Sequence, residues 1–507
     1  MPIRNRLIFS ALCGSLLAAG LAAASPGDFW RGWLVGAVLL VPGVYALAAS
    51  WRWGGGGRAL GWMVALAFLL RLGLGTAVSL LLPVYGHDSE VERAGYLFYD
   101  AYRRDSEAWD AAQSMTALSD PFNAVYDTDQ YRGMIVLSVL VYHYLSPDAH
   151  RMLLIVAAGA FAAAMGVAFF WKAVRARWGG RLALLAAWTL VLYPDGIFFS
   201  AAAMREPFLL GLICLAVWAA LTWREHPRGA ALAAGLSLGL MLLFSTLIAA
   251  ATLTVLAVWF YFDALYPRAR FWRLAGLAAL LVSVAALLIL RGDWLVNAAW
   301  YDLRLTVLAS GRVEAAIEEL GQRWRTPFLV VYGLAQPVLP AAIAYPTTWL
   351  WRVLGIWRAA GWYALAPFLV YAAFAAWKPA RAEPRRLWLW LAAAVLVWLV
   401  IASARAGGDQ WDNPRYRTLF LPWMALLAAG GLDWALVRRD PWLGRWLAVE
   451  GIFLLFFTDW YLSRYYQIHA RLQFTHMLAL IAGLSALVLA GGWAWDRWKS
   501  KKTTPQR

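Results

Sequence analysis

Long apolar runs recur throughout this chain, and they limit its fold more than any other feature. A run of roughly 20 residues is what an α-helix needs to cross the hydrocarbon core of a bilayer, because all of its backbone hydrogen bonds close within the segment. The runs are too long for barrel strands, and they do not alternate apolar and polar residues. Since 62% of the residues are hydrophobic, 15% are charged and the mean hydropathy is +0.58, the sequence predicts an all-α polytopic membrane protein.

The apolar runs predict about 14 transmembrane helices. The first run also has the basic start and the small-residue end of a signal peptide, but a second run follows at once, so we expect an uncleaved helix. The expected spans cover residues 7–25, 29–49, 59–83, 151–171, 182–200, 206–223, 229–245, 246–264, 271–290, 361–377, 387–404, 418–437, 446–463 and 474–494.

The basic residues set the expected orientation of these spans. The chain has 45 Lys+Arg against 29 Asp+Glu, a net charge of +16, but no basic stripe carries a recognition motif, so nucleic acid is not an expected partner. Arg and Lys gather instead in short loops, which the positive-inside rule assigns to the cytoplasm. Both termini then lie in the cytoplasm, provided that the apolar segments 131–145 and 327–346 make no net crossing. The alternative is that one of them crosses and a basic loop breaks the rule.

A long polar stretch, residues 85–130, interrupts the apolar runs and contains ten Asp or Glu against three Arg. Within it, Ser89 and Glu92 match a capping box at the start of a helix that runs toward Trp109. The mixed polar and aromatic side chains predict that this helix lies along the membrane interface. The expected topology puts four polar segments on the external face, at residues 85–130, 195–206, 293–325 and 404–417.

Asp88 is the first candidate for chemistry in the polar stretch. It follows Pro83, which ends the third expected span, by five residues, so we expect it at the outer membrane surface, where lipid head groups lie. A carboxylate there can act as a general base, with Glu90 assisting, or it can hold a divalent metal ion together with a phosphate. The structural alternative is that Asp88 caps a helix. No cofactor is specified beyond that open possibility of a metal ion.

Two later external segments carry charges at the edges of apolar spans. In "YPDGIFFSAAAMREP", Asp195, Arg205 and Glu206 are costly unless they are paired or functional, and an internal ion pair is the alternative to a binding role. Arg71, inside the third span, raises the same question.

The segment "RAGGDQWDNPRYRTLFLP" offers Arg405, Arg415, Tyr416 and Arg417. Arginine grips phosphate with two parallel donors, and several Arg on an external face run against the positive-inside trend. We therefore expect an anionic ligand there. The alternative is that these Arg pair with Asp409 and Asp412 of the same loop.

The pattern resembles the GT-C superfamily of integral membrane glycosyltransferases, the branch with protein O-mannosyltransferases and lipid A aminoarabinose transferases. The matching features are a span followed by Asp88, the downstream aromatic Tyr96, the "LYPDGIFFSAAAMRE" segment, and "PRYR" followed by "LFLPWMALLAAGGL". The likeness covers residues 59–437. Residues 1–58 and 438–507 look like additional transmembrane helices, the last with a basic tail.

The resemblance implies a transfer of sugar from a polyprenyl-phosphate donor to a glycan, lipid or protein acceptor outside the cytoplasmic (inner) membrane. Asp88 would deprotonate the acceptor hydroxyl, and Arg415 and Arg417 would hold the phosphate. The chain departs from the commonest family form because Asp88-Ser89-Glu90 replaces an adjacent acidic pair. The expected site comprises catalytic Asp88 and Glu90, phosphate-binding Arg205, Arg405, Arg415 and Arg417, and substrate-binding Tyr96, Asp195, Glu206 and Tyr416.

Two other functions stay open. A Wzy-like polymerase or O-antigen ligase would depend on Arg and His in late loops, with Asp88 dispensable. A flippase or transporter of lipid-linked sugars would have polar residues at the midplane and repeat symmetry between its halves.

Overall fold

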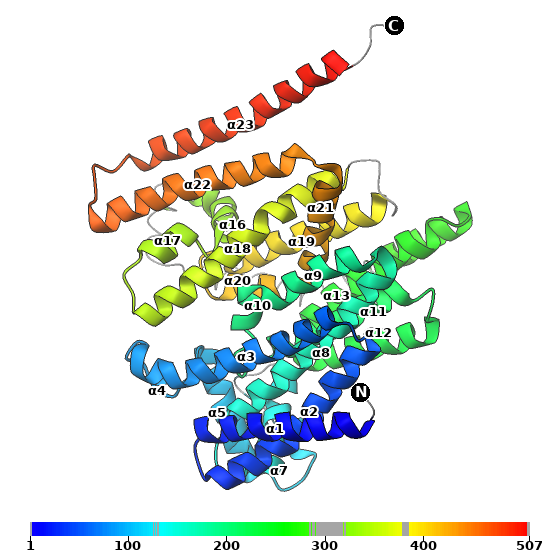
Figure 1. Cartoon of the computed structure of the whole chain (residues 1–507), viewed down its shortest axis with the longest axis vertical. Helices are drawn as coiled ribbons and strands as arrows, with labels where there is room; N and C mark the ends of the chain where they lie inside the picture. Colours follow the sequence, from blue (N-terminus) through cyan, green and yellow to red (C-terminus); the bar gives the residue numbers. More distant parts are fainter. Residues whose placement is uncertain are drawn as a thin grey trace. The chain divides into compact units, whose positions relative to one another are not determined.

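The architecture is entirely helical in the part of the chain that the structure, a computed structural model, describes (Figure 1). The described residues are 3–124, 126, 128, 131–282, 285, 289, 318, 321–377 and 385–503. Ten described helices are long and apolar enough to cross a membrane, or eleven if one bent pair of helices forms a single span. The chain is therefore an integral membrane protein, as the apolar runs predict.

The ten long helices coincide with ten of the expected spans. They are α1 (Ile3–Ala24), α2 (Phe29–Trp53), α3 (Arg58–Tyr85), α8 (Leu153–Trp178), α12 (Pro227–Phe244), α13 (Thr246–Phe260) with its π-helical end η1 (Tyr261–Leu265), α18 (Trp349–Ala375), α19 (Arg385–Ala406), α22 (Pro441–Tyr466) and α23 (Phe474–Thr503).

Three other expected spans correspond to shorter or bent helices. The 182–200 span is split into α9 (Gly180–Leu192) and α10 (Pro194–Phe198), because Pro194 cannot continue the first helix and starts the second. The 206–223 span is α11 (Glu206–Thr222), of 17 residues. The 418–437 span is the bent pair α20 (Asp412–Thr418) and α21 (Leu421–Arg438), which meet at 71°. The 271–290 span and the 293–325 loop extend beyond the described residues, which also leave out residues 378–384.

The chain divides into two compact units. Unit 1 comprises Met1–Ala298 together with the late segment Arg415–Leu426. Unit 2 comprises Ala299–Pro414 and Leu427–Arg507.

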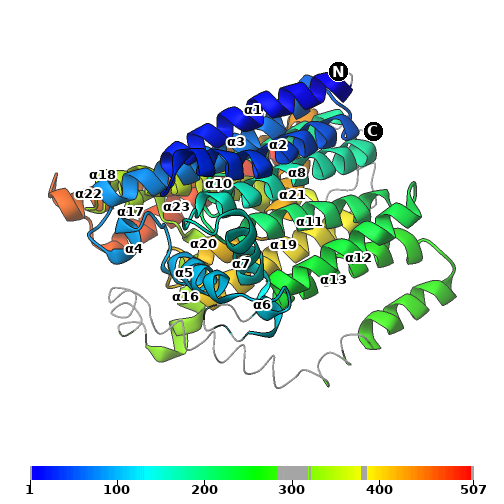
Figure 2. The same ribbon diagram turned by 90° about the horizontal axis from the view of Figure 1, so that it is seen from below.

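Unit 1 is built around α8, which packs against α2, α3, α9 and α11. In the most apolar stretch of α8, 78% of the residues are buried, whereas in that of α1 only 28% are buried. Small residues allow the close approach of α8 and α11: a Cβ on Gly211 would lie 2.3 Å from the Ala162 carbonyl oxygen, and one on Gly159 would lie 2.7 Å from Cγ of Pro207. Such close backbone contact is how membrane helices gain packing energy. Figure 2 shows α12 and α13 side by side, and they pack on each other next to α11.

Unit 2 contains α18, α19, α22 and α23, with two short helices, α16 (Arg325–Ala335) and α17 (Leu339–Ala344). These two occupy the expected 327–346 segment, and residues 336–338, which include Pro337, separate them. Trp362 donates to the Leu334 carbonyl oxygen at 2.9 Å, and Tyr363 donates to that of Ala335 at 3.0 Å. These bonds satisfy carbonyls at the end of α16.

The polar stretch forms two helices where we expected one running toward Trp109. Ser89 does cap the first, α4 (Glu90–Arg93), by accepting from the Glu92 amide, whereas the Glu92 carboxylate bonds to His87. The chain then breaks at Gly95, and α5 (Tyr99–Ser114) follows. Gly95 has a φ of 79°, and a Cβ there would lie 2.7 Å from the Ser79 carbonyl oxygen. Glycine fits both conditions, which is why the helix ends here. A third short helix, α6 (Asp120–Asn123), follows in the polar stretch, and the apolar segment 131–145 forms α7 (Gly133–Leu145).

Candidate functional site

Arg415 joins three segments of unit 1 through two carboxylates. Its Nε atom donates to Oε1 of Glu206, the first residue of α11, at 2.6 Å. Its Nη1 atom donates to Oδ2 of Asp100, in the first turn of α5, at 3.2 Å. The Glu206 side chain is 1% exposed, whereas that of Asp100 is 57% exposed. The "PRYR" segment is thus attached to the polar stretch and to the "MREP" segment.

Arg417, two residues further on, lies beside the second predicted acidic residue. Its Nη2 atom is 3.9 Å from Oδ2 of Asp195 in α10, and both side chains are at most 1% exposed. Gly196, the next residue of α10, lies close to two other side chains, because a Cβ there would lie 2.7 Å from Cδ2 of Leu421 and 3.9 Å from Nη2 of Arg71. Arg71 itself is buried and donates to the Ala67 carbonyl oxygen at 2.8 Å. Three buried charged groups therefore gather around α10.

Arg205 lies next to Glu206 in sequence and ends the loop before α11. Its Nη1 atom donates to the Phe244 carbonyl oxygen at 3.2 Å, and its guanidinium lies 5.0 Å from the centre of the Tyr131 ring. Arg205 is thus held by the end of α12 and by the residues before α7.

Asp88 and Glu90 lie at the exposed turn between α3 and α4. The Asp88 side chain is 91% exposed, and its Oδ1 atom is 3.6 Å from Nε of Arg93. Glu90 accepts a hydrogen bond of 2.7 Å from the hydroxyl of Tyr102 on α5, which raises the pKa of that tyrosine. Both carboxylates therefore face solvent, and Glu90 reaches a residue of α5 that borders a cavity described below.

Tyr96, the predicted substrate residue, belongs to a buried hydrogen-bonded cluster around Asp105 of α5. Asp105 is 2% exposed and accepts from the Tyr96 hydroxyl at 2.7 Å through Oδ2 and from the Tyr142 hydroxyl of α7 at 2.6 Å through Oδ1. Burial raises the pKa of Tyr96, and the neighbouring carboxylate raises it further. Tyr96 is therefore a neutral hydrogen-bond donor.

His150, just before α8, completes this cluster. Its Nε2 atom lies 2.8 Å from Oδ2 of Asp105, and its ring stacks on Trp109 with 5.1 Å between ring centres and 11° between planes. Asp105, Tyr142 and His150 were not among the residues predicted from the sequence. One signal was present, because Ala101, Asp105, Ala108 and Ala112 share one face of α5, and a lone acid in a stripe of small residues indicates burial.

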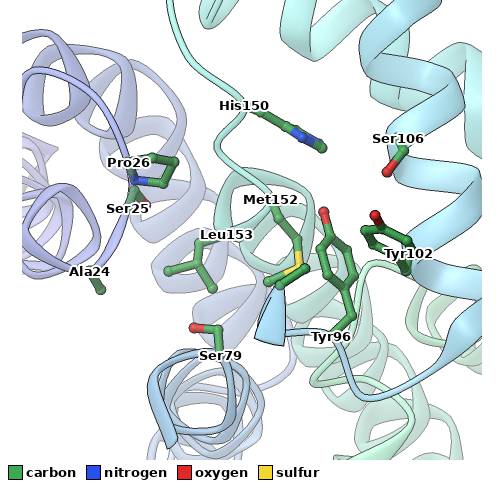
Figure 3. A pocket seen from close by; sticks show the side chains of 11 residues that line it. Ala24, Ser25, Pro26, Ser79, Tyr96, Tyr102, Ser106, His150, Met152 and Leu153 are labelled. Atoms are coloured by element: carbon green, nitrogen blue, oxygen red, sulfur yellow. The ribbon is translucent and has the colours of Figure 1, made fainter. Parts of the chain in front are cut away.

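A cavity of about 380 Å³ lies against this cluster (Figure 3). Figure 3 shows Tyr102 and Ser106 on one side, the α1–α2 turn with Ser25 and Pro26 on the other, and His150 at the edge between them. The remaining lining residues are Ala24, Ser79, Ala94, Tyr96, Met152 and Leu153. The cavity thus lies where α1 ends and α8 begins, beside the C-terminal part of α3.

Two more predicted residues lie on the helices α20 and α19. Tyr416 is half-buried in α20 between Arg415 and Arg417. Arg405 is half-buried in the last turn of α19, which belongs to unit 2. Among the described residues, no group of three or more His, Cys, Asp or Glu side chains is arranged to hold a metal ion.

Neither a protein-family model nor a curated protein matches this sequence. The interpretation of the site therefore rests on the residues and contacts of the chain itself.

Proposed function

We propose that this protein is a membrane glycosyltransferase of GT-C type, which moves a sugar from a polyprenyl-phosphate donor to an acceptor hydroxyl on the external face of the membrane. The observation that supports the proposal best is the attachment of the "PRYR" segment to two distant acidic segments through Arg415. Two arginines, two residues apart in one segment, are thereby held near buried carboxylates within one compact unit.

The two carboxylate partners of Arg415 differ in burial, and this difference would allow the guanidinium to bind a phosphate. Glu206 is buried and fixes the guanidinium, whereas Asp100 is exposed and can be exchanged for another anion. A lipid phosphate that displaces Asp100 would meet a planar donor group already held in position. Arg417 and Arg205 supply further positive charge in unit 1. The leaving phosphate is an anion, so such a clamp stabilises it as the glycosidic bond breaks.

Asp88 is the base in this proposal, with Glu90 beside it. Its carboxylate takes the proton of the acceptor hydroxyl, whose oxygen attacks the anomeric carbon with inversion. The bond from that carbon to the phosphate oxygen breaks, and the polyprenyl phosphate keeps the electron pair. An exposed carboxylate at the end of α3 suits an acceptor that arrives from the aqueous side.

We infer that the membrane arrangement follows the basic loops. It has about 14 crossings, both termini in the cytoplasm, no net crossing by α7 or by α16 with α17, and the site outside the inner membrane. The helices α4 and α5 lie along the external interface. Single cysteines at Ser89 and Gln410, both in polar segments, test this: an impermeant thiol reagent should label each from outside intact cells. Labelling from the cytoplasmic side only would overturn the arrangement.

The experiment on function uses purified protein in lipid nanodiscs with radiolabelled polyprenyl-phosphate sugars and a panel of glycan, lipid and peptide acceptors. Wild type should transfer label, and Asp88→Asn should lose at least about a hundredfold in rate, the usual contribution of a general base. Asp110→Asn, an exposed acid on α5, is the matched control. Transfer that survives Asp88→Asn contradicts the role of Asp88 and favours the Wzy-like alternative.

A further inference from the structure

We propose that the cavity beside His150 is a binding site for a neutral, hydroxyl-rich ligand of monosaccharide size, in which Nδ1 of His150 accepts a hydrogen bond from a ligand hydroxyl. Its assignment as the acceptor site of the transfer rests on the proposed function, whereas the binding itself does not.

The lining of the cavity determines the chemical class of this ligand. It contains the hydroxyls of Ser25, Ser79, Tyr102 and Ser106, and its 11 lining residues include no Asp, Glu, Lys or Arg. Without a cation the site cannot compensate a phosphate or carboxylate, and without an acid it cannot compensate an amine. Hydroxyl groups and aromatic faces together suit a sugar-like polyol. The volume of about 380 Å³ lies at the small end of ligand sites, which begin near roughly 300 Å³.

Contacts with Asp105 and Trp109 hold the His150 ring in one orientation. Asp105 is an acceptor, so the hydrogen-bond network assigns a proton to Nε2 of His150, and in the neutral imidazole Nδ1 is then the acceptor. Tyr96 and Tyr142 donate to the same carboxylate and fix it in turn. The flat stack on Trp109 prevents rotation of the ring.

A histidine that only filled space would be enclosed by its neighbours. The His150 ring is instead 26% exposed and borders the cavity. Within the part of the chain that the structure describes, Nδ1 has no hydrogen-bond partner. A fixed acceptor beside a cavity of hydroxyls is the arrangement that recognises a ligand hydroxyl, with Asp105 as a positioning residue.

The same end of unit 1 holds the other polar groups. Asp100, which bonds to Arg415, lies on α5 five positions before Asp105, and Tyr102 connects the cavity to Glu90. A ligand in the cavity would therefore lie near the α3–α4 turn. This is where an acceptor of the proposed transfer has to be.

The test is saturation-transfer NMR on the full-length protein in nanodiscs, with the methyl glycosides of glucose, galactose and mannose as probes. At least one glycoside should bind, and glucose 6-phosphate should not. His150→Phe keeps the stack on Trp109 and loses the acceptor, so it should weaken binding about tenfold, as expected for one lost hydrogen bond. Ser106→Leu should abolish binding by filling the cavity, whereas Ser114→Leu, on the same helix but exposed, should not change it.

A second measurement uses Ser106→Cys in a background in which Cys13 is replaced by Ser. The bound glycoside should slow the reaction of this cysteine with a small neutral thiol reagent. The cavity proposal fails if none of the three glycosides shows saturation transfer, or if binding is unchanged in both His150→Phe and Ser106→Leu. Binding without any sugar transfer would overturn the proposed function alone, whereas transfer without such binding would overturn this inference alone.

Discussion

Nε of Arg415 lies 2.6 Å from Oε1 of Glu206, although the two residues are 209 positions apart in the chain. The pair is buried in unit 1, where a carboxylate without a cation is strongly unfavourable. The contact therefore fixes the late segment Arg415–Leu426 to the early helices.

Removing one partner of this pair should destabilise the protein. Glu206→Ala leaves the Arg415 guanidinium in a buried position without its closest carboxylate, and we expect a loss of about 3 kcal/mol or more. Glu225→Ala, which removes an exposed acid near the other end of α11, should have little effect. Thermal unfolding in detergent compares the two. Equal midpoints for the two variants would show that the pair contributes nothing.

The double variant Glu206→Leu with Arg415→Met should recover much of that loss. Both buried charges are then absent, and replacing a whole buried ion pair with apolar side chains is often neutral. The same double variant should be inactive in sugar transfer if Arg415 holds the donor phosphate. Stability and activity thus respond in opposite ways, which separates a structural role from a binding role.

The contact of α8 with α11 should tolerate no added methyl group at Gly211. A Cβ there would lie 2.3 Å from a backbone oxygen, that of Ala162, so the helices must move apart. We expect Gly211→Ala to cost about 1–3 kcal/mol, the usual effect of overpacking. Gly235→Ala in α12 meets nothing within 4 Å and should be neutral or stabilising by up to about 1 kcal/mol. Unfolding of both variants in parallel checks the difference.

The raised pKa of Tyr96 predicts how the free energy of unfolding changes at alkaline pH. Its pKa is raised in the folded protein, while an unfolded tyrosine titrates near about pH 10. Above that pH the unfolded state loses a proton that the folded state keeps, so stability is complete below about pH 10 and falls by about 1.4 kcal/mol per pH unit above it.

Tyr96→Phe should make this alkaline slope shallower, at the cost of one hydrogen bond to Asp105. Tyr99→Phe, which removes an exposed tyrosine at the start of α5, controls for the loss of a hydroxyl. Unfolding free energies between pH 8 and pH 11 give the slopes. A wild-type slope in Tyr96→Phe would contradict the prediction.

In unit 2, an ion pair with two hydrogen bonds connects the C-terminal helix α23 to α22. Arg445 of α22 donates to both oxygens of Asp496 on α23, at 2.6 and 2.7 Å. Only 6% of the most apolar stretch of α23 is buried, and Phe474 at its start also packs against Phe457 and Trp460 of α22. Asp496→Asn should speed hydrogen exchange in α23 and leave α8 unchanged. The reversed pair Arg445→Asp with Asp496→Arg should restore slow exchange.

The sequence predicted the helices well because membrane spans are encoded locally. A run such as 153–178 must be helical wherever it packs, since lipid offers its backbone no hydrogen bonds. Asp195 and Glu206 could be singled out because charge at a span edge has to be compensated. Arg415 and Arg417 could be singled out because arginines on an expected external face run against the positive-inside trend. What the sequence could not indicate was which arginine meets which acid.

Asp105 and His150 show why the rest was missed. Asp105 occurs in "YRRDSEAWDAAQ", where neighbouring charges are typical of a solvated helix face. Its burial depends on Tyr142 of α7 and on His150, which lie 37 and 45 positions further along. A local sequence pattern cannot predict contacts between residues so far apart in the chain. The break at Gly95 was hidden similarly, since it depends on the approach of α3 at Ser79.

The membership of the segment Arg415–Leu426 in unit 1 sets an order for biosynthesis. Glu206 and Asp195 leave the ribosome about 210 residues before Arg415 and Arg417 do. During that interval the early helices are in the bilayer with their acids not yet joined to these cations, and at 5–20 residues per second it lasts on the order of ten seconds or longer. The late segment Arg415–Leu426 therefore completes unit 1. A nascent chain that stalls before Arg415 would hold an incomplete unit 1, which quality-control factors could recognise.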